Sequence, residues 1–361
     1  ANTLNASDTL DGNGGADTIQ ADIATGATTI TLDWDTHTDI ENLVAYNPLG
    51  TSTNNMVVVI NGHTTASLNA AAFTVDASAS LLTGTLVFND AGTNTITTAF
   101  TVTGTTAADN IEGSLGNDII SGGGTTTGDT LEGHGGNDSI TGNSGADSIT
   151  GGAGNDLALT GNAGADTIDG GTGNDSIDGG SGADIIYGQT GSDTITGGAG
   201  NDKFYYGAAN VLDGATGGYA AESKGITRDT ITDFTAGGDD LMILMVLADG
   251  EKFISNDLGD VANAGEANGV FTGVAGDMIF IDDVARLVID SDGDGSLDGT
   301  DFQINLTGNT GFSDADINYT IAGSTGANTM YGGAGSDTIT SNNGADSIKG
   351  NAGADSLTGG T

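Results

Sequence analysis

Aspartate residues recur at one fixed place in a short glycine-rich repeat, and their carboxylates could do metal chemistry. Clean copies, such as 133–141 and 170–178, follow the pattern G-G-x-G-x-D-x-U-x, in which U is a large apolar residue. Glycine allows the positive φ angles and the close backbone approach that a tight turn needs. Such a turn directs carbonyl oxygens and one carboxylate inward. Because Ca²⁺ takes about six to eight oxygen ligands at roughly 2.3–2.6 Å, the repeat predicts a row of calcium sites.

The spacing of the repeats predicts the elements that position these turns. If each repeat makes one turn and one short strand, two repeats make a full coil with turns on opposite edges. Alternation along each strand sends only the U side chain into the interior. These interior positions are Ile140, Ile149, Ile168, Ile177, Ile186, Ile195 and Phe204. The expected fold class is all-β: a parallel β-roll or β-helix solenoid of calcium-binding nonapeptide repeats, with interspersed irregular β modules.

The same spacing predicts two stacks of carboxylates, in which two aspartates of successive coils share each ion. One edge stacks Asp138, Asp156, Asp175 and Asp193, and the other stacks Asp147, Asp166, Asp184 and Asp202. The remaining expected ligands in repeats are Asp118, Asp337, Asp346 and Asp355. An extra residue in 157–160 and a two-residue insertion in 122–132 interrupt the period, and we expect bulges there.

A second aspartate-rich pattern has the spacing of an EF-hand loop. Asp290, Asp292, Asp294, Asp298 and Asp301 match loop positions 1, 3, 5, 9 and 12, with Gly295 at position 6. Residues 285–289 read as a strand and not as a helix. We therefore expect a calcium-binding, EF-like loop between strands, and a plain Asp/Gly turn is the alternative.

Four parts follow from the distribution of these patterns. Residues 1–103 are a β-rich module with degenerate N-terminal repeats around Asp8 and Asp17, continuing as a β-helix or a sandwich-like layer. Residues 104–205 are the main β-roll, and 206–321 are a β-rich, cap-like module with the EF-like loop. Residues 322–361 are a second, truncated array. The chain stops at Gly359-Gly360-Thr361, which matches the opening of a further repeat, so we expect a longer polypeptide.

The charge of the chain restricts its partners. Of the 361 residues, 49 are acidic and 6 are basic, which gives a formal net charge of −43. A compact body with this charge repels itself, so a bound cation is needed. Nucleic acid and anionic membranes are unsuitable partners. No apolar run approaches the ~20 residues of a membrane span, so we expect no membrane insertion. Without calcium we expect the chain to be disordered.

These repeats resemble those of the RTX (repeats-in-toxin) group of secreted bacterial proteins. The resemblance implies type I secretion, passage out of the cell in an unfolded state, and folding as a parallel β-roll outside. Residues 229–244 and 287–308 look like the module that follows RTX arrays in secreted proteases and lipases. The alternation of Thr/Ala-rich β segments with repeat blocks looks more like RTX surface-layer proteins and large adhesins.

The surface-layer resemblance implies a location outside the cell, on the bacterial cell surface, and two kinds of partner. The first is further copies of the chain, in a lattice or filament. The second is a cell-surface polysaccharide such as lipopolysaccharide, as an anchor. The alternatives are a segment of an RTX adhesin, or the secretion and folding domain of an RTX hydrolase or toxin.

Catalytic patterns are missing from the sequence. The three histidines, His37, His63 and His134, form no H-E-x-x-H motif, and no G-x-S-x-G motif occurs. His134 stands at the second position of a turn, where we expect it to be exposed to solvent. Nearly all paired carboxylates are accounted for as turn ligands. We therefore expect no enzyme in this sequence.

Overall fold

A computed structural model describes most of the repeat arrays and a set of strands outside them. The described residues are 18–22, 28–33, 42–46, 56–61, 72–76, 86–89, 97, 99–124, 126–207, 229–235, 238–246, 252–254, 256–261, 277–281, 286–290, 302–307 and 314–360. The chain divides into two compact units, residues 1–184 and 185–361. The elements within the described residues are β-strands and one short 3₁₀ turn, Asp314–Asp316.

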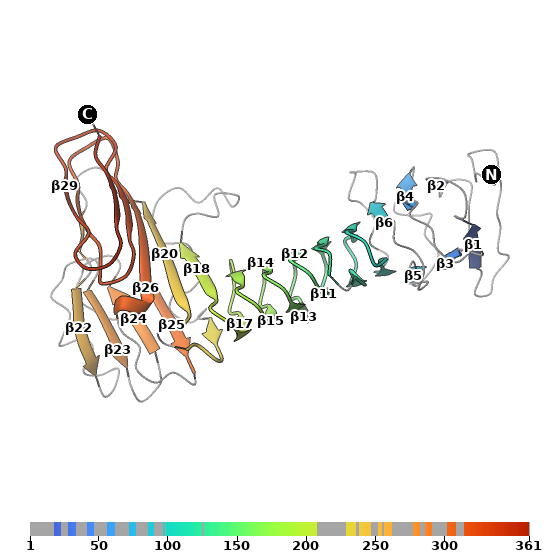
Figure 1. The fold of residues 1–361 in the computed structure, drawn as a ribbon, viewed down its shortest axis with the longest axis horizontal. Coiled ribbons are helices and arrows are strands. Elements are labelled where there is room, and N and C mark those ends of the chain that lie inside the picture. The colour runs from blue at the N-terminus through green and yellow to red at the C-terminus, as the bar shows by residue number, and fades with distance from the viewer. Residues whose placement is uncertain are drawn as a thin grey trace. The chain divides into compact units, whose positions relative to one another are not determined.

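The first unit consists of two parallel sheets between which successive strands alternate (Figure 1). One sheet contains β1 (Thr18–Asp22), β3 (Asn42–Tyr46), β5 (Ala72–Asp76), β7 (Ala99–Thr103), β9 (Ile119–Ser121), β11 (Ser139–Ser144), β13 (Ala158–Ala163) and β15 (Ser176–Ser181). The other contains β2 (Thr28–Asp33), β4 (Met56–Asn61), β6 (Leu86–Asn89), β8 (Asn110–Glu112), β10 (Thr130–Gly135), β12 (Ser148–Ala153) and β14 (Thr167–Thr172). This alternation makes a β-solenoid, and the predicted fold class is confirmed. The described strands between residues 21 and 103 pair parallel and alternate between the two sheets, as in a β-helix and not as in a sandwich-like layer.

The register of the strands confirms that two repeats make one coil. Thr130 lies opposite Ser148 on the neighbouring strand, which is a step of eighteen residues. The insertion before β10 makes the step from Ile111 to Leu131 two residues longer. The extra residue at Leu157 makes the step from Ser139 to Ala158 one residue longer. Leu157 is 67% exposed, so the solenoid absorbs this residue as an outward bulge.

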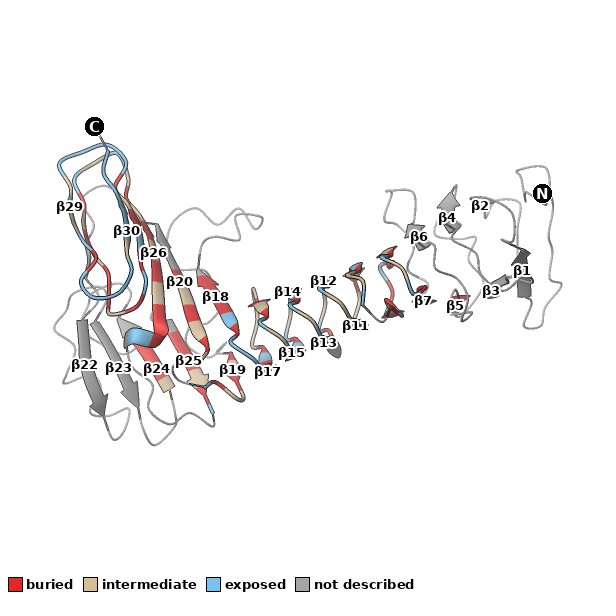
Figure 2. Cartoon of the chain, in the orientation of Figure 1, coloured by how far each residue is buried: buried red, intermediate tan, exposed pale blue. Residues whose placement is uncertain are grey.

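Each strand of the repeat array contributes about one large side chain to the interior. Figure 2 shows the buried residues along these strands in red. Ile140, Ile149 and Ile168 are fully buried, as predicted, and Leu159 takes the same position in the bulged repeat. Their neighbours alternate outward, which is the two-residue period of a strand. Two aliphatic side chains per coil offset only a small part of the entropy lost when the coil is ordered. The repeat array therefore needs a further source of stability.

The glycines of the repeat serve two different purposes. In the turn that begins at Gly151, the second and fourth residues, Gly152 and Gly154, have φ angles of +111° and +141°. Gly151 itself lacks a positive φ, but a Cβ there would lie 2.6 Å from the carbonyl oxygen of Gly170. The two uses of glycine expected from the sequence, positive φ and close backbone approach, thus fall at different positions of the turn. The first glycine instead provides room for the chain of the next coil.

The second unit begins as the same kind of solenoid and contains a different module. One parallel sheet contains β16 (Ile185–Tyr187), β18 (Lys203–Gly207), β20 (Asp240–Val246), β26 (Ile317–Ala322), β28 (Thr338–Thr340) and β30 (Ser356–Thr358). A second sheet contains β17 (Thr194–Ala199), β19 (Thr230–Ile231), β25 (Phe302–Leu306), β24 (Arg286–Asp290), β23 (Asp277–Ile281) and β22 (Asn256–Val261). A third contains β21 (Lys252–Ile254), β27 (Thr329–Tyr331) and β29 (Ser347–Lys349). Strands β23, β24 and β25 pair antiparallel, which interrupts the coiling.

Candidate metal centres

Aspartates of successive coils stack along one edge of the first unit, in the order that the sequence predicts. The backbone N–H of Asp118 donates to Oδ1 of Asp138 at 2.8 Å, and that of Asp138 donates to Oδ1 of Asp156 at 2.9 Å. The N–H of Asp156 donates to Oδ1 of Asp175 at 2.8 Å. Each carboxylate is therefore fixed by the turn of the preceding coil. Its role as a calcium ligand stays a prediction.

The opposite edge carries an equivalent stack that begins earlier than the sequence analysis expected. The N–H of Asp109 donates to Asp129 at 2.8 Å, and the N–H of Asp129 donates to Asp147 at 2.7 Å. The stack continues from Asp147 to Asp166 at 2.8 Å and from Asp166 to Asp184 at 2.9 Å. Asp109 and Asp129 were not among the ligands predicted from the sequence. Both precede an apolar residue two positions later, as in the other repeats, and this pattern could have identified them.

The second oxygen of many of these carboxylates is buried without a partner. No hydrogen bond reaches Oδ2 of five successive aspartates of the first unit: Asp129, Asp138, Asp147, Asp156 and Asp166. These residues are at most 2% exposed. A buried carboxylate oxygen without a donor is costly, and native proteins rarely leave one unsatisfied. The arrangement therefore favours a cation beside each Oδ2.

Backbone oxygens lie close to the same atoms. A Cβ placed on Gly133 would run into Oδ2 of Asp138 and would lie 2.6 Å from the carbonyl oxygen of Gly151 in the next coil. A Cβ on Gly161 would meet Oδ2 of Asp166 and the carbonyl oxygen of Gly179 at the same distance of 2.6 Å. The surroundings of each Oδ2 thus include a carbonyl oxygen, and oxygen ligands suit Ca²⁺.

Burial makes the charged form of these aspartates unfavourable. It raises the pKa of Asp129 and of Asp138 from 3.8 to about 7, against the smaller lowering effect of one backbone N–H each. Burial also raises the pKa of Asp118 and of Asp175 to about 6. The pKa values of Asp147, Asp156, Asp166 and Asp184 are raised for the same reason. The stacks therefore need either protons or bound cations to be stable.

The residues present fit calcium, and the backbone must supply much of the coordination. No group of three or more His, Asp or Glu side chains converges on one point within the ranges that the structure describes. Each expected site instead combines carboxylates of successive coils with carbonyl oxygens of the turns. A calcium ion there would neutralise the carboxylates and satisfy the Oδ2 atoms.

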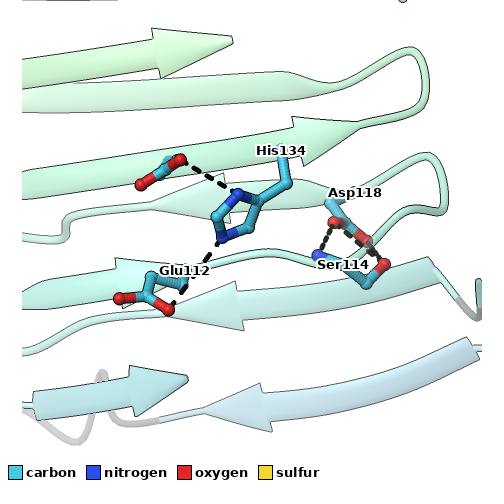
Figure 3. Close-up of polar contacts among 5 residues, drawn as sticks. Glu112, Ser114, Asp118 and His134 are labelled. Atoms are coloured by element: carbon cyan, nitrogen blue, oxygen red, sulfur yellow. Dashed lines mark hydrogen bonds and ion pairs between the residues drawn. The ribbon is translucent and has the colours of Figure 1, made fainter. Parts of the chain in front are cut away.

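Two turns of the first unit satisfy their carboxylates without a cation, and Figure 3 shows one of them, the turn of Ser114 and Asp118. The N–H of Ser114 donates to Oδ2 of Asp118 at 2.6 Å, and its hydroxyl lies 3.0 and 3.1 Å from the two carboxylate oxygens. Thr105 makes the same contacts with Asp109, at 2.6 Å from its N–H and at 2.9 and 3.1 Å from its hydroxyl. Asp118 thus lies in the predicted stack but differs from Asp138 in having hydrogen bonds to both oxygens.

His134 lies at the second position of the turn that follows Glu132, with a φ of +71°. Its Nδ1 is 2.9 Å from a carboxylate oxygen of Glu132, and its Nε2 is 3.9 Å from one of Glu112 (Figure 3). This contact lowers the pKa of Glu132. The His134 side chain is only 19% exposed, so the expected solvent exposure is wrong. The ring thus lies between the carboxylate of Glu132 on its own strand, β10, and that of Glu112 on the neighbouring strand, β8.

The second unit contains equivalent contacts, including two at aspartates that the sequence analysis missed. The N–H of Asp193 donates to Asp229 at 2.9 Å, and that of Asp202 donates to Asp239 at 3.0 Å. Asp229 and Asp239 precede Ile231 and Leu241, but only one of the three repeat glycines is kept before each, Gly225 and Gly237, so the D-x-U pattern is the main signal that could have identified them.

The C-terminal array of the second unit repeats the stacked arrangement. The N–H of Asn328 donates to Asp346 at 2.9 Å, and that of Asp337 donates to Asp355 at 3.1 Å. Asp337 is buried, whereas Asp346 and Asp355 are partly exposed. The array therefore has the predicted arrangement, and its calcium binding stays a prediction.

The predicted EF-like loop joins two antiparallel strands. Asp290 is the last residue of β24, and β25 begins at Phe302, so the prediction of a strand before the loop is confirmed. The other predicted ligands of this loop, Asp292, Asp294, Asp298 and Asp301, lie outside the described residues. Asp8 and Asp17 of the degenerate N-terminal repeats also lie outside them.

Comparison with known families agrees with the geometry of the stacks. The family model described as RTX calcium-binding nonapeptide repeat matches residues 3–23, 103–126, 124–158, 160–194, 178–212, 320–348 and 340–361. Calcium-binding repeats of the RTX type are therefore present in the chain. No curated protein matches the chain. Among the described residues, no helix has the length and apolar character to cross a membrane.

Proposed function

We propose that this chain is a calcium-dependent structural protein of a bacterial surface layer or a related extracellular assembly. In this proposal it leaves the cell by type I secretion, then folds and self-assembles when it binds Ca²⁺. The observation that supports the calcium dependence is the row of five buried aspartates whose Oδ2 atoms lack a hydrogen-bond partner: Asp129, Asp138, Asp147, Asp156 and Asp166.

Calcium is expected to act as a ligand of the folded state. The net charge of −43 opposes folding. Each strand of the array contributes only about one aliphatic side chain to the interior, so hydrophobic burial is small. An ion that binds the folded chain and not the unfolded chain adds about 2.7 kcal/mol at a hundred times its Kd. About ten such sites would exceed the whole stability of an ordinary domain, which is about 5–15 kcal/mol. Folding should therefore be cooperative in calcium.

The assembly part of the proposal rests on charge and on repetition. A solenoid offers a long, regular surface. Outward-facing carboxylates such as that of Asp178, which is exposed, could be bridged by calcium to a neighbouring copy. A lipopolysaccharide or another cell-surface polysaccharide would serve as the anchor. In this proposal the stacked carboxylates hold the coils together through bound ions, so their role is structural and not enzymatic.

The antiparallel strands of the second unit favour a second candidate. Strands β23, β24 and β25 follow an array of repeats, as cap modules do in secreted RTX hydrolases. The chain would then be the secretion and folding domain of a hydrolase or toxin. A segment of an RTX adhesin is the other alternative, in which the solenoid is a rigid stalk.

Size-exclusion chromatography with light scattering, as calcium is titrated into EDTA-treated protein, tests the proposal. Compaction followed by growth into large particles that EDTA dissolves would support a self-assembling structural protein. Compaction at constant monomer mass would contradict assembly and favour the adhesin or the secretion domain. A chain that is equally compact with and without calcium would contradict the calcium dependence itself.

A further inference from the structure

The turns of the repeat array adopt two conformations that differ at the second residue. In closed turns this residue donates its N–H to the carboxylate or amide oxygen four residues later. The donors are Thr105, Ser114, Thr235, Ser324 and Gly333. In open turns the second residue has a positive φ, as at His134, Asn143, Gly152 and Asn162. None of these five closing residues has a positive φ.

From this difference we infer that the second residue of each turn determines whether the turn needs a cation. Ser and Thr at this position close the turn with hydrogen bonds, whereas Asn, His and most Gly residues leave it open for Ca²⁺. This inference rests on the proposed calcium binding and names the residues that control it. It assigns the turns of Asp109 and Asp118 as calcium-independent, and it revises the sequence-based assignment of Asp118 as a ligand.

A complete hydrogen-bond network takes the place of an ion in the closed turns. The hydroxyl of Ser114 accepts the N–H of Gly116 at 2.9 Å and lies within hydrogen-bonding distance of both oxygens of Asp118. The hydroxyl of Thr105 likewise accepts the N–H of Ala107 at 3.0 Å. A further donor, the N–H of Phe100, reaches Oδ1 of Asp118 at 2.5 Å. Each oxygen of this carboxylate therefore has a backbone donor as well as the hydroxyl.

The open turns leave one oxygen unsatisfied in the same place. Asp138, Asp147, Asp156 and Asp166 lie four residues after His134, Asn143, Gly152 and Asn162, and the Oδ2 of each has no hydrogen-bond partner. Their Oδ1 atoms make the same contact with the preceding coil as that of Asp118 does. The two kinds of turn thus share the contact between coils at Oδ1 and differ at Oδ2, which has a backbone donor only in the closed turns and where an ion would bind in the open ones.

Backbone preferences explain why the second residue controls the conformation. Positive φ is unfavourable for most residues, and least so for Gly and Asn. Asn occupies this position with positive φ at Asn143, Asn162, Asn342 and Asn351. Gly333 closes its turn without a hydroxyl, so glycine permits either conformation. Ser and Thr favour the closed one, because their hydroxyls bond to nearby backbone groups.

The closed turns of the first unit lie where the stacks of aspartates begin. In the described part of the array, each stack of the first unit begins with one: Asp109 donates to Asp129 on one edge, and Asp118 donates to Asp138 on the other. An ion in the first turn of a stack would have ligands from one side only. The closed turns would therefore form the end of the calcium array. They would give the first bound ions a neighbouring turn that is already ordered by its own hydrogen bonds.

Counting calcium ions bound to the full chain by native mass spectrometry tests the inference. Ser114→Asn should open a turn and add at least one ion, whereas Ser114→Thr, which retains the hydroxyl, should leave the count unchanged. In the reverse direction, Asn162→Ser should remove at least one ion, and the control Asn162→Gly should remove none.

The possible ion counts bear either on the inference or on the proposed calcium binding. An unchanged count in Ser114→Asn, or in Asn162→Ser, would overturn the inference. If Ser114→Asn does not fold, the Asn162→Ser and Asn162→Gly pair decides alone. Wild-type protein that retains no calcium would instead overturn the proposed function. The failure of the inference and the failure of calcium binding are therefore distinguishable.

Discussion

The closed turns at 104–109 and 113–118 and the open turns at 133–138 and 151–156 belong to the same solenoid and share most of their structure. Both kinds begin with a glycine and end in a stacked aspartate. Asp118 and Asp138 each accept a backbone N–H of the preceding coil through Oδ1. Only Asp118 also has donors to Oδ2, from Ser114. Stacking alone therefore does not create the need for a cation; the unsatisfied second oxygen of the carboxylate does.

The electrostatics of the two turns follow the same division. Burial raises the pKa of both aspartates, to about 6 for Asp118 and to about 7 for Asp138. Hydrogen bonds from Phe100 and Ser114 oppose this effect at Asp118. At Asp138 one backbone hydrogen bond opposes it, and the charges of Asp118 and Asp156 add to it. The open turn is thus the less favourable place for a negative charge without a counterion.

Removal of two stacked carboxylates from open turns should have the largest effect. The double variant Asp138→Ala and Asp156→Ala should raise the calcium concentration at the folding midpoint by at least about tenfold. Each lost site removes about 2.7 kcal/mol of stabilisation at a hundred times its Kd. The matched control is Asp178→Ala, which removes an exposed carboxylate of the same unit and should shift the midpoint less than twofold. Circular dichroism during a calcium titration measures both, and equal shifts would contradict the stacked-site account.

Acidification in EDTA should partly replace calcium. The pKa of Asp138 is about 7 in the folded chain and near 3.8 when unperturbed, so protonation favours the folded state. This contribution is fully present below a pH of about 4 and is lost as the pH rises through about 7. Each unit of pKa difference corresponds to about 1.4 kcal/mol. Circular dichroism in EDTA should therefore show more β structure at pH 5 than at pH 8.

The pH dependence should reverse when calcium is in excess, because protons then compete with the bound ions. Thermal unfolding in calcium should occur at a lower temperature at pH 5 than at pH 8. The same direction of change in EDTA and in calcium would show that the buried carboxylates do not bind the ions.

Loss of the closing hydroxyl should lower the stability by a smaller amount. We expect no additional ion to bind in this variant. Ser114→Ala removes the hydroxyl contacts with Asp118 but retains the backbone N–H contact. A hydrogen bond to a charged group contributes about 1.5–3 kcal/mol, so the free energy of unfolding should fall by about that amount. Thermal or urea unfolding in calcium measures the change. A gain in bound calcium by this variant would show that the hydroxyl, and not the φ of residue 114, excludes the ion.

The contact of His134 with the neighbouring carboxylates should contribute least. His134→Asn retains a residue type that adopts positive φ elsewhere in the array and removes the contacts with Glu112 and Glu132. Partly exposed ion pairs contribute about 0–1 kcal/mol. The stability in calcium should therefore change by less than about 1 kcal/mol, and the number of bound ions should stay the same. A larger loss, measured by urea unfolding, would mean that the imidazole itself supports the turn.

The sequence predicts the solenoid and the order of the stacks because both depend on periodicity. The positions of Ile140, Ile149 and Ile168 show which side chains face the interior. A step of two repeats places Asp138 and Asp156 next to each other in successive coils. The bulge at Leu157 was also predictable, because one extra residue interrupts the period. These features need no knowledge of side-chain contacts.

The two classes of turn were not predictable from the periodicity. Asp118 and Asp138 occupy equivalent places in the repeat, and they differ only through the contacts of the residue four positions earlier. The antiparallel pairing of β23, β24 and β25 was also not predicted, because the repeat pattern is lost there. Asp229 and Asp239 were missed because the sequence before each keeps only one of the three glycines that identify the other turns.

Hydrogen exchange of the full chain, compared in EDTA and in saturating calcium, tests the central claim most directly. Peptides from 139–172, which contain only open turns, should exchange at least about a hundredfold faster in EDTA, as expected for the loss of one saturated site or more. Peptides from 99–121, which contain the closed turns of Asp109 and Asp118, should show a smaller change. Equal protection of 139–172 in EDTA and in calcium would contradict the claim that the open turns need a cation.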